Sequence, residues 1–230
     1  MLNRYHLDAA LEPGTSVVLE GDEHHHAVRV HRVREGEGVE LFDGRGIAVL
    51  ARIESIGPRS LGLSIESRIV EPREPRLELE LAVALIHPDR LELVLQKATE
   101  IGVASFQPIT TSRTEVRPER VLGRSERWAK IVLEAVKQSG RSVIPRLEPV
   151  IPLEQALARP GVNVILDPSG ESSPPPAASV RLFVGPEGGW SEEELDAARR
   201  MGAHSWSLGH RRLRAETAAI AGAALLLLHE

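Results

Sequence analysis

The chain has 230 residues, enough for one large domain or two smaller ones, and its 42% hydrophobic residues can supply a core. A net charge of −5 with 27% charged residues argues against a uniformly basic protein that simply wraps nucleic acid, although local basic patches can still attract phosphate. The chain contains no cysteine, which excludes disulfides and thiolate metal sites.

Residues 1–70 have the pattern of a small β domain. Short segments rich in β-branched residues alternate with turns that contain Gly or Pro, and strands are expected at 16–19, 39–42, 47–53 and 61–65. The Asp43-Gly44 pair between two of them is a hairpin signal. Because several short strands must close up or pack to cover their edges, the pattern predicts a small β-barrel.

Residues 22–32 predict one short helix that carries clustered histidines, among them His24, His25 and His26. Neighbouring histidines point in different directions, and no cysteine or suitably spaced acid completes a tetrahedral ligand set. We therefore expect no metal site here.

Residues 71–76 are polar and interrupted by proline, which predicts a linker and a domain boundary. From residue 77 to residue 230, strand and helix patterns alternate, and this favours an α/β domain with a largely parallel sheet and helices on both faces. Strands are expected at 79–86, 106–110, 162–166, 181–184 and 205–208, and helices at 91–101, 128–140, 153–158, 191–201 and 217–229.

Two glycine-containing loops follow the strands at 181–184 and 205–208. The first contains Gly-Pro-Glu-Gly-Gly at 185–189 and leads into a helix that a Ser191–Glu194 capping box should start. The second covers residues 208–216. Glycine lets a ligand approach the main chain closely, and two such loops at neighbouring strand ends can build one ligand pocket at the edge of an α/β sheet. The alternative is a pair of tight turns that hold no ligand.

Three arginines, Arg211, Arg212 and Arg214, stand beside the predicted start of the last helix. A helix N-terminus already carries partial positive charge, so a purely structural helix would favour acids there. This crowding of cations favours an anionic ligand, either RNA phosphate or a cofactor carboxylate, with Glu216 fixing one arginine. A surface arginine cluster with an ordinary glutamate pair is the alternative.

The segment 217–228 is apolar almost all round, so as a helix it must be buried on more than one side, by the sheet and a neighbour or by a second subunit. It is shorter than the roughly 20 residues that a membrane helix needs. With no signal peptide at the N-terminus, we expect a cytoplasmic protein that is not in the membrane. A dinucleotide-binding Gly-x-Gly-x-x-Gly, a P-loop and a nucleophile elbow are all absent.

The paired loops resemble the SPOUT class of trefoil-knotted RNA methyltransferases. They are most similar to the RsmE family, which methylates N3 of a uridine in the 16S ribosomal RNA of the small subunit. The segments 24–34, 96–102 and 134–141 match the same family, so the resemblance covers nearly the whole chain. It implies a C-terminal knotted methyltransferase domain, an N-terminal PUA-like β-barrel that contacts RNA, and a homodimer that buries the last helix.

The resemblance also implies roles for individual residues, with S-adenosylmethionine as the cofactor. The implied cofactor-binding residues are Leu166, Gly185, Glu187, Gly188, Gly189, Leu208, Gly209, His210, Leu213 and Ala215. The implied RNA contacts are His25, Arg29, Arg32, Arg34, Lys97 and Arg141, and the implied catalytic residues are Arg211, Arg214 and Glu216. Two positions depart from the family pattern: His210 replaces a proline and Ala215 a threonine.

Two other classes of function remain open at this point. The chain can be a non-catalytic RNA-binding or ribosome-assembly protein that kept the fold, or a hydrolase-like or nucleotide-binding α/β enzyme. The intact loops argue against the first class, and the missing nucleotide and nucleophile motifs argue against the second.

Overall fold

The computed structural model describes residues 2–70 and 74–228. It divides into two compact units, one made of Met1–Glu74 and Val136–Ile144 and the other of Pro75–Ala135 and Pro145–Glu230. The predicted linker at 71–76 falls partly on residues 71–73, which lie outside the described residues. The division into domains 1–70 and 77–230 stays a prediction.

The first unit is built on a five-stranded sheet in the order β1-β3-β4-β5-β2. Its strands are β1 (Arg4–His6), β2 (Ser16–Glu20), β3 (Gly38–Phe42), β4 (Ala48–Ile56) and β5 (Ser60–Arg68). β1 pairs parallel to β3, and the other pairs are antiparallel. The predicted β-barrel is thus present as a half-barrel around a core that includes Tyr5, Leu41 and Leu63. Three-residue β1 is too short to show an alternating pattern and was not predicted.

The Asp43-Gly44 hairpin lies between β3 and β4 as predicted. The Asp43 carboxylate accepts hydrogen bonds from the amides of Arg45 and Ile47, and Gly44 has a φ of +76°. The prediction of one short helix at 22–32 is confirmed in position, but the helix changes type along its length. The structure has a short α1 (Gly21–His25) followed by a π-helix, η1 (His26–His31), and it ends at Arg32, whose φ of 53° is left-handed.

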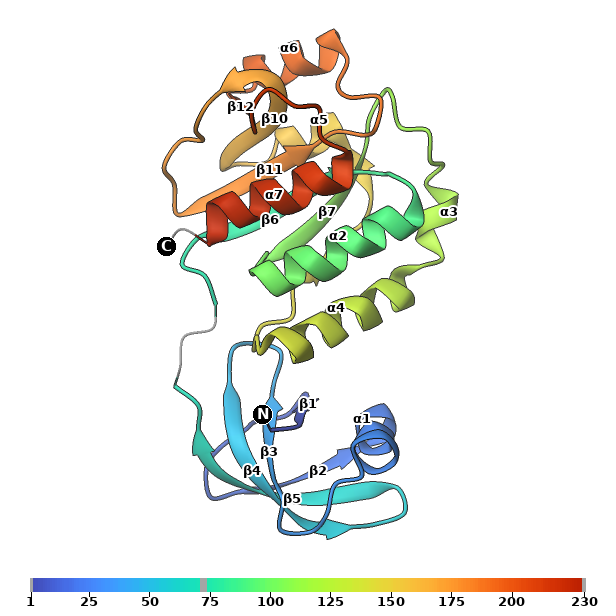
Figure 1. Ribbon diagram of the computed structural model, residues 1–230, viewed down its shortest axis with the longest axis vertical. Coiled ribbons are helices and arrows are strands. Elements are labelled where there is room, and N and C mark those ends of the chain that lie inside the picture. Colours follow the sequence, from blue (N-terminus) through green and yellow to red (C-terminus); the bar gives the residue numbers. More distant parts are fainter. Residues whose placement is uncertain (1, 71–73, 229–230) are drawn as a thin grey trace. The chain divides into compact units, whose positions relative to one another are not determined.

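The second unit contains a seven-stranded sheet, and all its strands are parallel (Figure 1). The strands are β6 (Glu78–Ala84), β7 (Ser105–Thr110), β8 (Arg146–Leu147), β9 (Ile151–Pro152), β10 (Val162–Glu171), β11 (Ser179–Val184) and β12 (His204–Trp206). Their order is β12-β10-β11-β6-β7-β8, and β9 also pairs with β7. The predicted parallel α/β sheet is confirmed, and the trefoil knot stays a prediction.

Helices lie on both faces of this sheet, as alternation of strands and helices predicts. The helices are α2 (Pro88–Ile101), α3 (Glu119–Leu122), α4 (Ser125–Ser139), α5 (Leu153–Leu157), α6 (Glu192–Arg200) and α7 (Ala215–Leu227). α5 and α6 pack on the face that carries Ala82 and Phe183, and α2 and α7 lie side by side on the other face (Figure 1). The predicted end of the last helix at His229 lies outside the described residues.

Gly222 allows α7 to approach the sheet closely. A Cβ at this position would be 2.9 Å from a methyl of Leu182 and 3.3 Å from one of Leu166. A larger residue would push α7 away from β10 and β11. Helix α7 is therefore seated directly on β10 and on β11, the strand that precedes the first predicted loop.

Candidate functional site

The predicted loops meet at one edge of the parallel sheet. β10 lies between β11 and β12, so the carboxyl ends of these strands are neighbours. The loop after β11 (residues 185–191, here the first loop) leads into α6, and the loop after β12 (residues 207–214, the second loop) leads into α7 (Figure 1). Ligands bind at such edges because the loops and helix N-termini present backbone groups there.

The first loop is held by hydrogen bonds from its own residues. The amide of Gly189, where φ is +68°, donates to the Pro186 carbonyl at 2.9 Å. The indole of buried Trp190 donates to the Leu166 carbonyl at 2.9 Å and ties the loop to β10. The predicted capping box is present, with the Glu194 amide donating to the Ser191 hydroxyl and the Ser191 amide to the Glu194 carboxylate.

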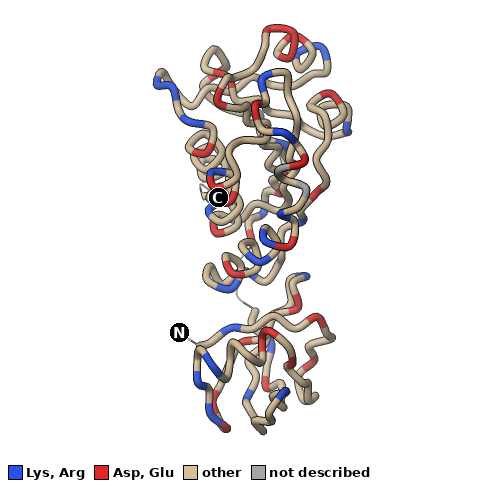
Figure 2. Tube along the Cα trace, turned by 90° about the vertical axis from the view of Figure 1, so that its right-hand side faces the viewer, with Lys and Arg blue, Asp and Glu red and all other residues tan. Residues whose placement is uncertain are grey.

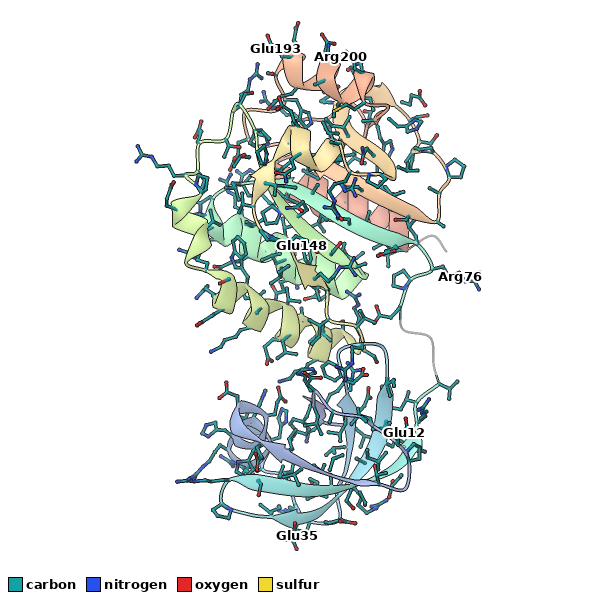
Figure 3. The ribbon with its side chains drawn as sticks, turned by 180° about the vertical axis from the view of Figure 1, so that it is seen from behind. Glu12, Glu35, Arg76, Glu148, Glu193 and Arg200 are labelled. Carbon is teal, nitrogen blue, oxygen red and sulfur yellow. The ribbon has the colours of Figure 1, made fainter. Side chains whose placement is uncertain are left out.

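The capping box opens a helix with an acidic first turn. Hydrogen bonds from the backbone amide of Glu193 and from the Ser191 hydroxyl hold the pKa of the Glu193 carboxyl below its usual value. Glu193 points outward from α6, as does Arg200 near its other end (Figure 3). These two residues therefore lie on the solvent side of the helix, away from the sheet edge.

The second loop is anchored to β10. The Ser207 amide donates to the Glu171 carbonyl at 2.8 Å, and the Ser207 hydroxyl donates to the Pro168 carbonyl at 3.1 Å. Gly209 has a φ of +103°, which favours glycine, and its amide donates to the Ser207 hydroxyl. The loop ends at Arg214, the N-cap of α7, whose side chain makes no capping hydrogen bond.

A cavity of about 500 Å³ lies between the two loops. Of the residues predicted to hold the cofactor, Leu166, Gly185, Glu187, Gly189, Leu208, Gly209, His210, Leu213 and Ala215 line it. Gly188 does not: a Cβ there would meet Arg113 at 3.3 Å, and its carbonyl accepts a hydrogen bond from the Arg113 guanidinium. Arg212 of the predicted arginine cluster also lines the cavity. No role was assigned from the sequence to the other lining residues, which are Asp167, Pro168, Val184, Pro186, Trp190, Trp206 and Ala218.

The cavity combines apolar walls with charges of both signs. Trp190, Trp206 and Leu166 supply apolar surface, Asp167 and Glu187 supply carboxylates, and arginines of the second loop supply cations. Its volume lies within the roughly 300–1,000 Å³ typical of small-molecule sites. These residues fit a ligand of cofactor size with a flat ring, a cationic group and a carboxylate, which are the parts of S-adenosylmethionine.

The predicted catalytic residues lie at different distances from the cavity. Arg211 lines it, whereas the Arg214 side chain is 75% exposed and does not. Glu216 is buried, and its Oε1 lies 4.0 Å from Arg214 Nη1, which is an ion pair without a hydrogen bond. Thus the structure places only Arg211 of these three residues on the cavity wall.

Comparison with known proteins identifies the family. Residues 72–227 match the family described as "RNA methyltransferase domain", and residues 19–66 match the one described as "RNA methyltransferase PUA domain". The chain belongs to this RNA methyltransferase family. A relative named ribosomal RNA small subunit methyltransferase E, from Rickettsia conorii, is 32% identical over 98% of this chain and 95% of its own. A relative of the same name from Bacillus subtilis is 29% identical over 94% of this chain and 93% of its own.

Solved structures of this methyltransferase family agree with the fold. The Neisseria gonorrhoeae ribosomal RNA small subunit methyltransferase E, bound to S-adenosylmethionine, has a TM-score of 0.91 and 33% identity, covering 98% of this chain and 97% of its own. A Legionella pneumophila methyltransferase with the same bound cofactor has a TM-score of 0.88 and 33% identity, covering 98% of this chain and 97% of its own. The PUA-like unit and the parallel-sheet unit inferred from the sequence are therefore those of a methyltransferase of this family.

Four residues predicted to contact RNA are exposed on the first unit. His25 lies in α1, Arg29 in η1, and Arg32 and Arg34 in the turn that follows. Basic residues, nearly all of them arginines, are interspersed with acidic residues along the trace of this unit (Figure 2). In the second unit Lys97 is half-buried, and its ammonium donates to Glu100 at 2.9 Å.

The prediction that Arg141 contacts RNA is not supported by its surroundings. Its side chain is only 4% exposed, and its Nε and Nη2 donate to the Glu74 carboxylate at 2.9 and 2.7 Å. The same carboxylate accepts hydrogen bonds from the amides of Ser142 and Val143. Arg141 therefore holds residues 136–144 within the first unit, a role that the helix-end pattern at Gly140-Arg141 does not reveal.

Helix α7 is only partly covered in the single chain. Ala219, Gly222, Ala223 and Leu227 are buried, while Leu225 and Leu228 are 47% and 65% exposed. In the described part of the chain, no helix is long and apolar enough to cross a membrane. No group of potential ligands that could hold a metal ion is found among the residues that the structure describes.

Proposed function

We propose that the chain transfers a methyl group from S-adenosylmethionine to N3 of a uridine in the 16S RNA of the small ribosomal subunit. The observation that carries the proposal is the cavity between the two loops, in a chain similar over nearly its whole length to small-subunit methyltransferases. The apolar walls and the charges of both signs support binding of this cofactor. Action on ribosomal RNA supports a cytoplasmic location.

In this proposal the two loops hold the cofactor from opposite sides. The Gly185 and Gly209 backbones border the ligand, and Trp190 and Trp206 offer flat apolar surface. The carboxylates of Asp167 in β10 and Glu187 in the first loop balance its cationic groups. When bound, the sulfonium supplies an electrophilic methyl group. The protein's contribution is to fix that group against the incoming base, and such orientation can lower the barrier by about 7–11 kcal/mol in favourable cases.

The arginines of the second loop would act on the uracil. Uridine N3 must lose its proton before it can attack, and the resulting negative charge spreads onto the ring oxygens. Arg211 lies on the cavity wall, and Arg214 stands three residues further on at the start of α7. A cation beside the ring oxygens favours the anion, and the partial positive charge of the α7 N-terminus adds to this effect.

A methylation assay tests the proposed function. Purified protein should methylate N3 of one uridine in small-subunit RNA, detected by mass spectrometry of nuclease fragments. Free uridine should react far more slowly, because it lacks the phosphates that the exposed arginines of the first unit would hold. Binding of S-adenosylmethionine with no methyl transfer to any small-subunit RNA would instead favour a non-catalytic assembly protein that kept the pocket.

In the same assay, changing Arg29 and Arg32 to Ala should raise the KM for RNA and leave the affinity for S-adenosylmethionine unchanged. Removal of one arginine that binds a phosphate should reduce the slope of log affinity against log salt by about one for duplex RNA, taking the value for double-stranded DNA as a guide. Arg52→Ala is the matched control, since Arg52 is an exposed arginine of the same unit that pairs with Glu66. An equal KM in all three proteins would contradict RNA binding by this surface.

We further propose that the protein is a homodimer that covers the exposed part of α7. Leu225 on α7, Leu228 directly after it and Leu93 on α2 expose apolar surface, and the two helices pack together. Sedimentation at micromolar concentration should give about twice the chain mass of 25.1 kDa. Leu225→Glu should shift the protein towards the monomer, whereas the same change at exposed Val18 of the first unit should not. A monomeric wild-type protein would reject the dimer.

A further inference from the structure

Arg90 contacts acidic residues of two separate segments that border the cavity. Its Nη1 lies 2.9 Å from the Oε1 of Glu187 in the first loop. Its Nε lies 3.8 Å from the Oε1 of Glu216, which follows the second loop at the start of α7. One guanidinium thus spans two segments that come from different strands and lead into different helices.

The fold explains why a residue of α2 reaches this edge. β6 pairs in parallel with β11, with Val83 opposite Val184, so the two strands end side by side. Helix α2 begins four residues after β6, with Pro88 at its N-terminus, and Arg90 lies in its first turn. α2 also packs against α7. Arg90 is therefore placed between the first loop and the start of α7 by β6 and α2, neither of which contributes a residue to the cavity.

The two carboxylates that Arg90 contacts differ in their surroundings. Glu187 lines the cavity, and its main-chain carbonyl lies 3.5 Å from Arg212 Nη2 of the second loop. Glu216 is buried, and its Oε2 has no hydrogen-bond partner in the described structure. A second cation near Glu216 is the largely exposed Arg214, at 4.0 Å. A buried carboxylate without hydrogen bonds is costly unless a nearby charge compensates it, and Arg90 supplies such a charge.

We propose that Arg90 is a positioning residue that joins the first loop to the start of α7 beside the cavity and thereby sets the affinity for S-adenosylmethionine. This inference rests on the proposed function, since it takes the cavity to be the cofactor site. Arg90 does not line the cavity, so it acts through Glu187 and Glu216. Removing it frees Glu187 from α2 and leaves two acidic groups of the site without their common partner.

An isolated, half-exposed ion pair would have little effect, because such pairs contribute little to stability in water. The bridge differs in that Glu187 lines the ligand site and Glu216 lies in the first turn of α7, next to Ala215, which also lines it. Loosening it should lower affinity for the ligand that needs both loops in place. It should change the turnover of protein that is already saturated with cofactor much less.

The test compares Arg90→Ala, Arg90→Lys and Arg199→Ala. Arg199 is an exposed arginine of α6 that pairs with Asp196 at 2.7 Å, so its removal controls for the loss of one surface ion pair. We expect Arg90→Ala to raise the Kd and KM for S-adenosylmethionine about fivefold, the upper end for an exposed pair, with kcat within about twofold. Arg90→Lys should fall between wild type and Arg90→Ala, since an ammonium is a point charge that does not span two carboxylates as a guanidinium does.

A double-mutant cycle with Glu187→Gln tests the bridge itself. If Glu187 acts through Arg90, adding Glu187→Gln to Arg90→Ala should weaken binding by much less than it does in the wild-type background. Fully additive effects, or an Arg90→Ala protein that binds the cofactor like Arg199→Ala, would overturn the proposal. Thermal unfolding of each variant identifies any loss of fold, and Arg90→Lys and Glu187→Gln keep the test valid if Arg90→Ala does not fold.

The outcomes separate this inference from the proposed function. Wild-type protein that fails to bind S-adenosylmethionine would remove the proposed function and the Arg90 inference together. Wild-type protein that binds it, together with an Arg90→Ala variant of equal Kd, would remove only the inference. A fall in kcat with an unchanged cofactor Kd would also overturn it, because that result places Arg90 in the methyl-transfer step.

Discussion

Gly209→Val should weaken the binding of S-adenosylmethionine by on the order of a hundredfold, which corresponds to about 2.7 kcal/mol. Gly209 lines the cavity, and no atom lies within 4 Å of the place where its Cβ would be. A branched side chain there would occupy space that the ligand needs next to the backbone. Calorimetric titration of the variant and the wild-type protein measures the loss.

Backbone strain needs its own control in that experiment, because Gly209 has a φ of +103° and valine adopts such a conformation reluctantly. Gly161→Val is the matched variant. Gly161 has a φ of +128°, also has no atom within 4 Å of a Cβ, and lies outside the cavity. We expect Gly161→Val to lose stability and to keep its affinity for the cofactor. A folded Gly209→Val protein that binds as tightly as Gly161→Val would rule out this cavity as the cofactor site.

The sequence predicted the local structure of the site well because the signals are local. Gly188-Gly189 before a Ser191–Glu194 capping box marks a turn into a helix, and the structure contains both. Local patterns do not predict that the two loops lie close together in space. It depends on β10 lying between β11 and β12, a long-range pairing that no local pattern encodes. The resemblance to a known family supplied it.

Residues that act through tertiary contacts give no local signal, for the same reason. Arg90 lies on the polar side of an ordinary amphipathic helix, and only the pairing of β6 with β11 brings it to Glu187. Arg141 follows a glycine at a helix end, where an exposed arginine is common, yet Glu74 holds it inside the first unit. The spacing of residues along the chain predicts which of them share one face of a helix. It does not predict which other parts of the protein pack against that face.

The π-helix shows a further limit of reading periodicity. Residues 22–32 were expected to form one short helix, and the wider turn of η1 changes which side chains share a face. Tyr5 of β1 nevertheless meets His31 at the end of η1, with 2.7 Å between the hydroxyl and Nδ1. Through this hydrogen bond, β1 holds the end of η1, while Arg29 and Arg32 stay exposed. Their exposure is compatible with the implied RNA contacts, which stay a prediction.

Arg211→Ala should lower kcat for methyl transfer by about a hundredfold or more, in line with the loss of one preorganised donor to a developing negative charge. The affinity for RNA should fall much less, because one of many phosphate-attracting cations is removed. Single-turnover assays at saturating S-adenosylmethionine and RNA measure the chemical step directly. Arg200→Ala is the control, since Arg200 points outward from α6 (Figure 3).

The same assay on Arg214→Ala decides how the two arginines divide the work. Arg211 lines the cavity, whereas Arg214 is largely exposed and lies 4.0 Å from Glu216. If position on the cavity wall determines which cation meets the uracil oxygens, Arg211→Ala should be the more damaging change. A larger loss of kcat in Arg214→Ala would mean that Arg214 turns inward when RNA is bound and that Glu216 releases it. Normal rates in both variants would contradict stabilisation of the uracil anion by this loop.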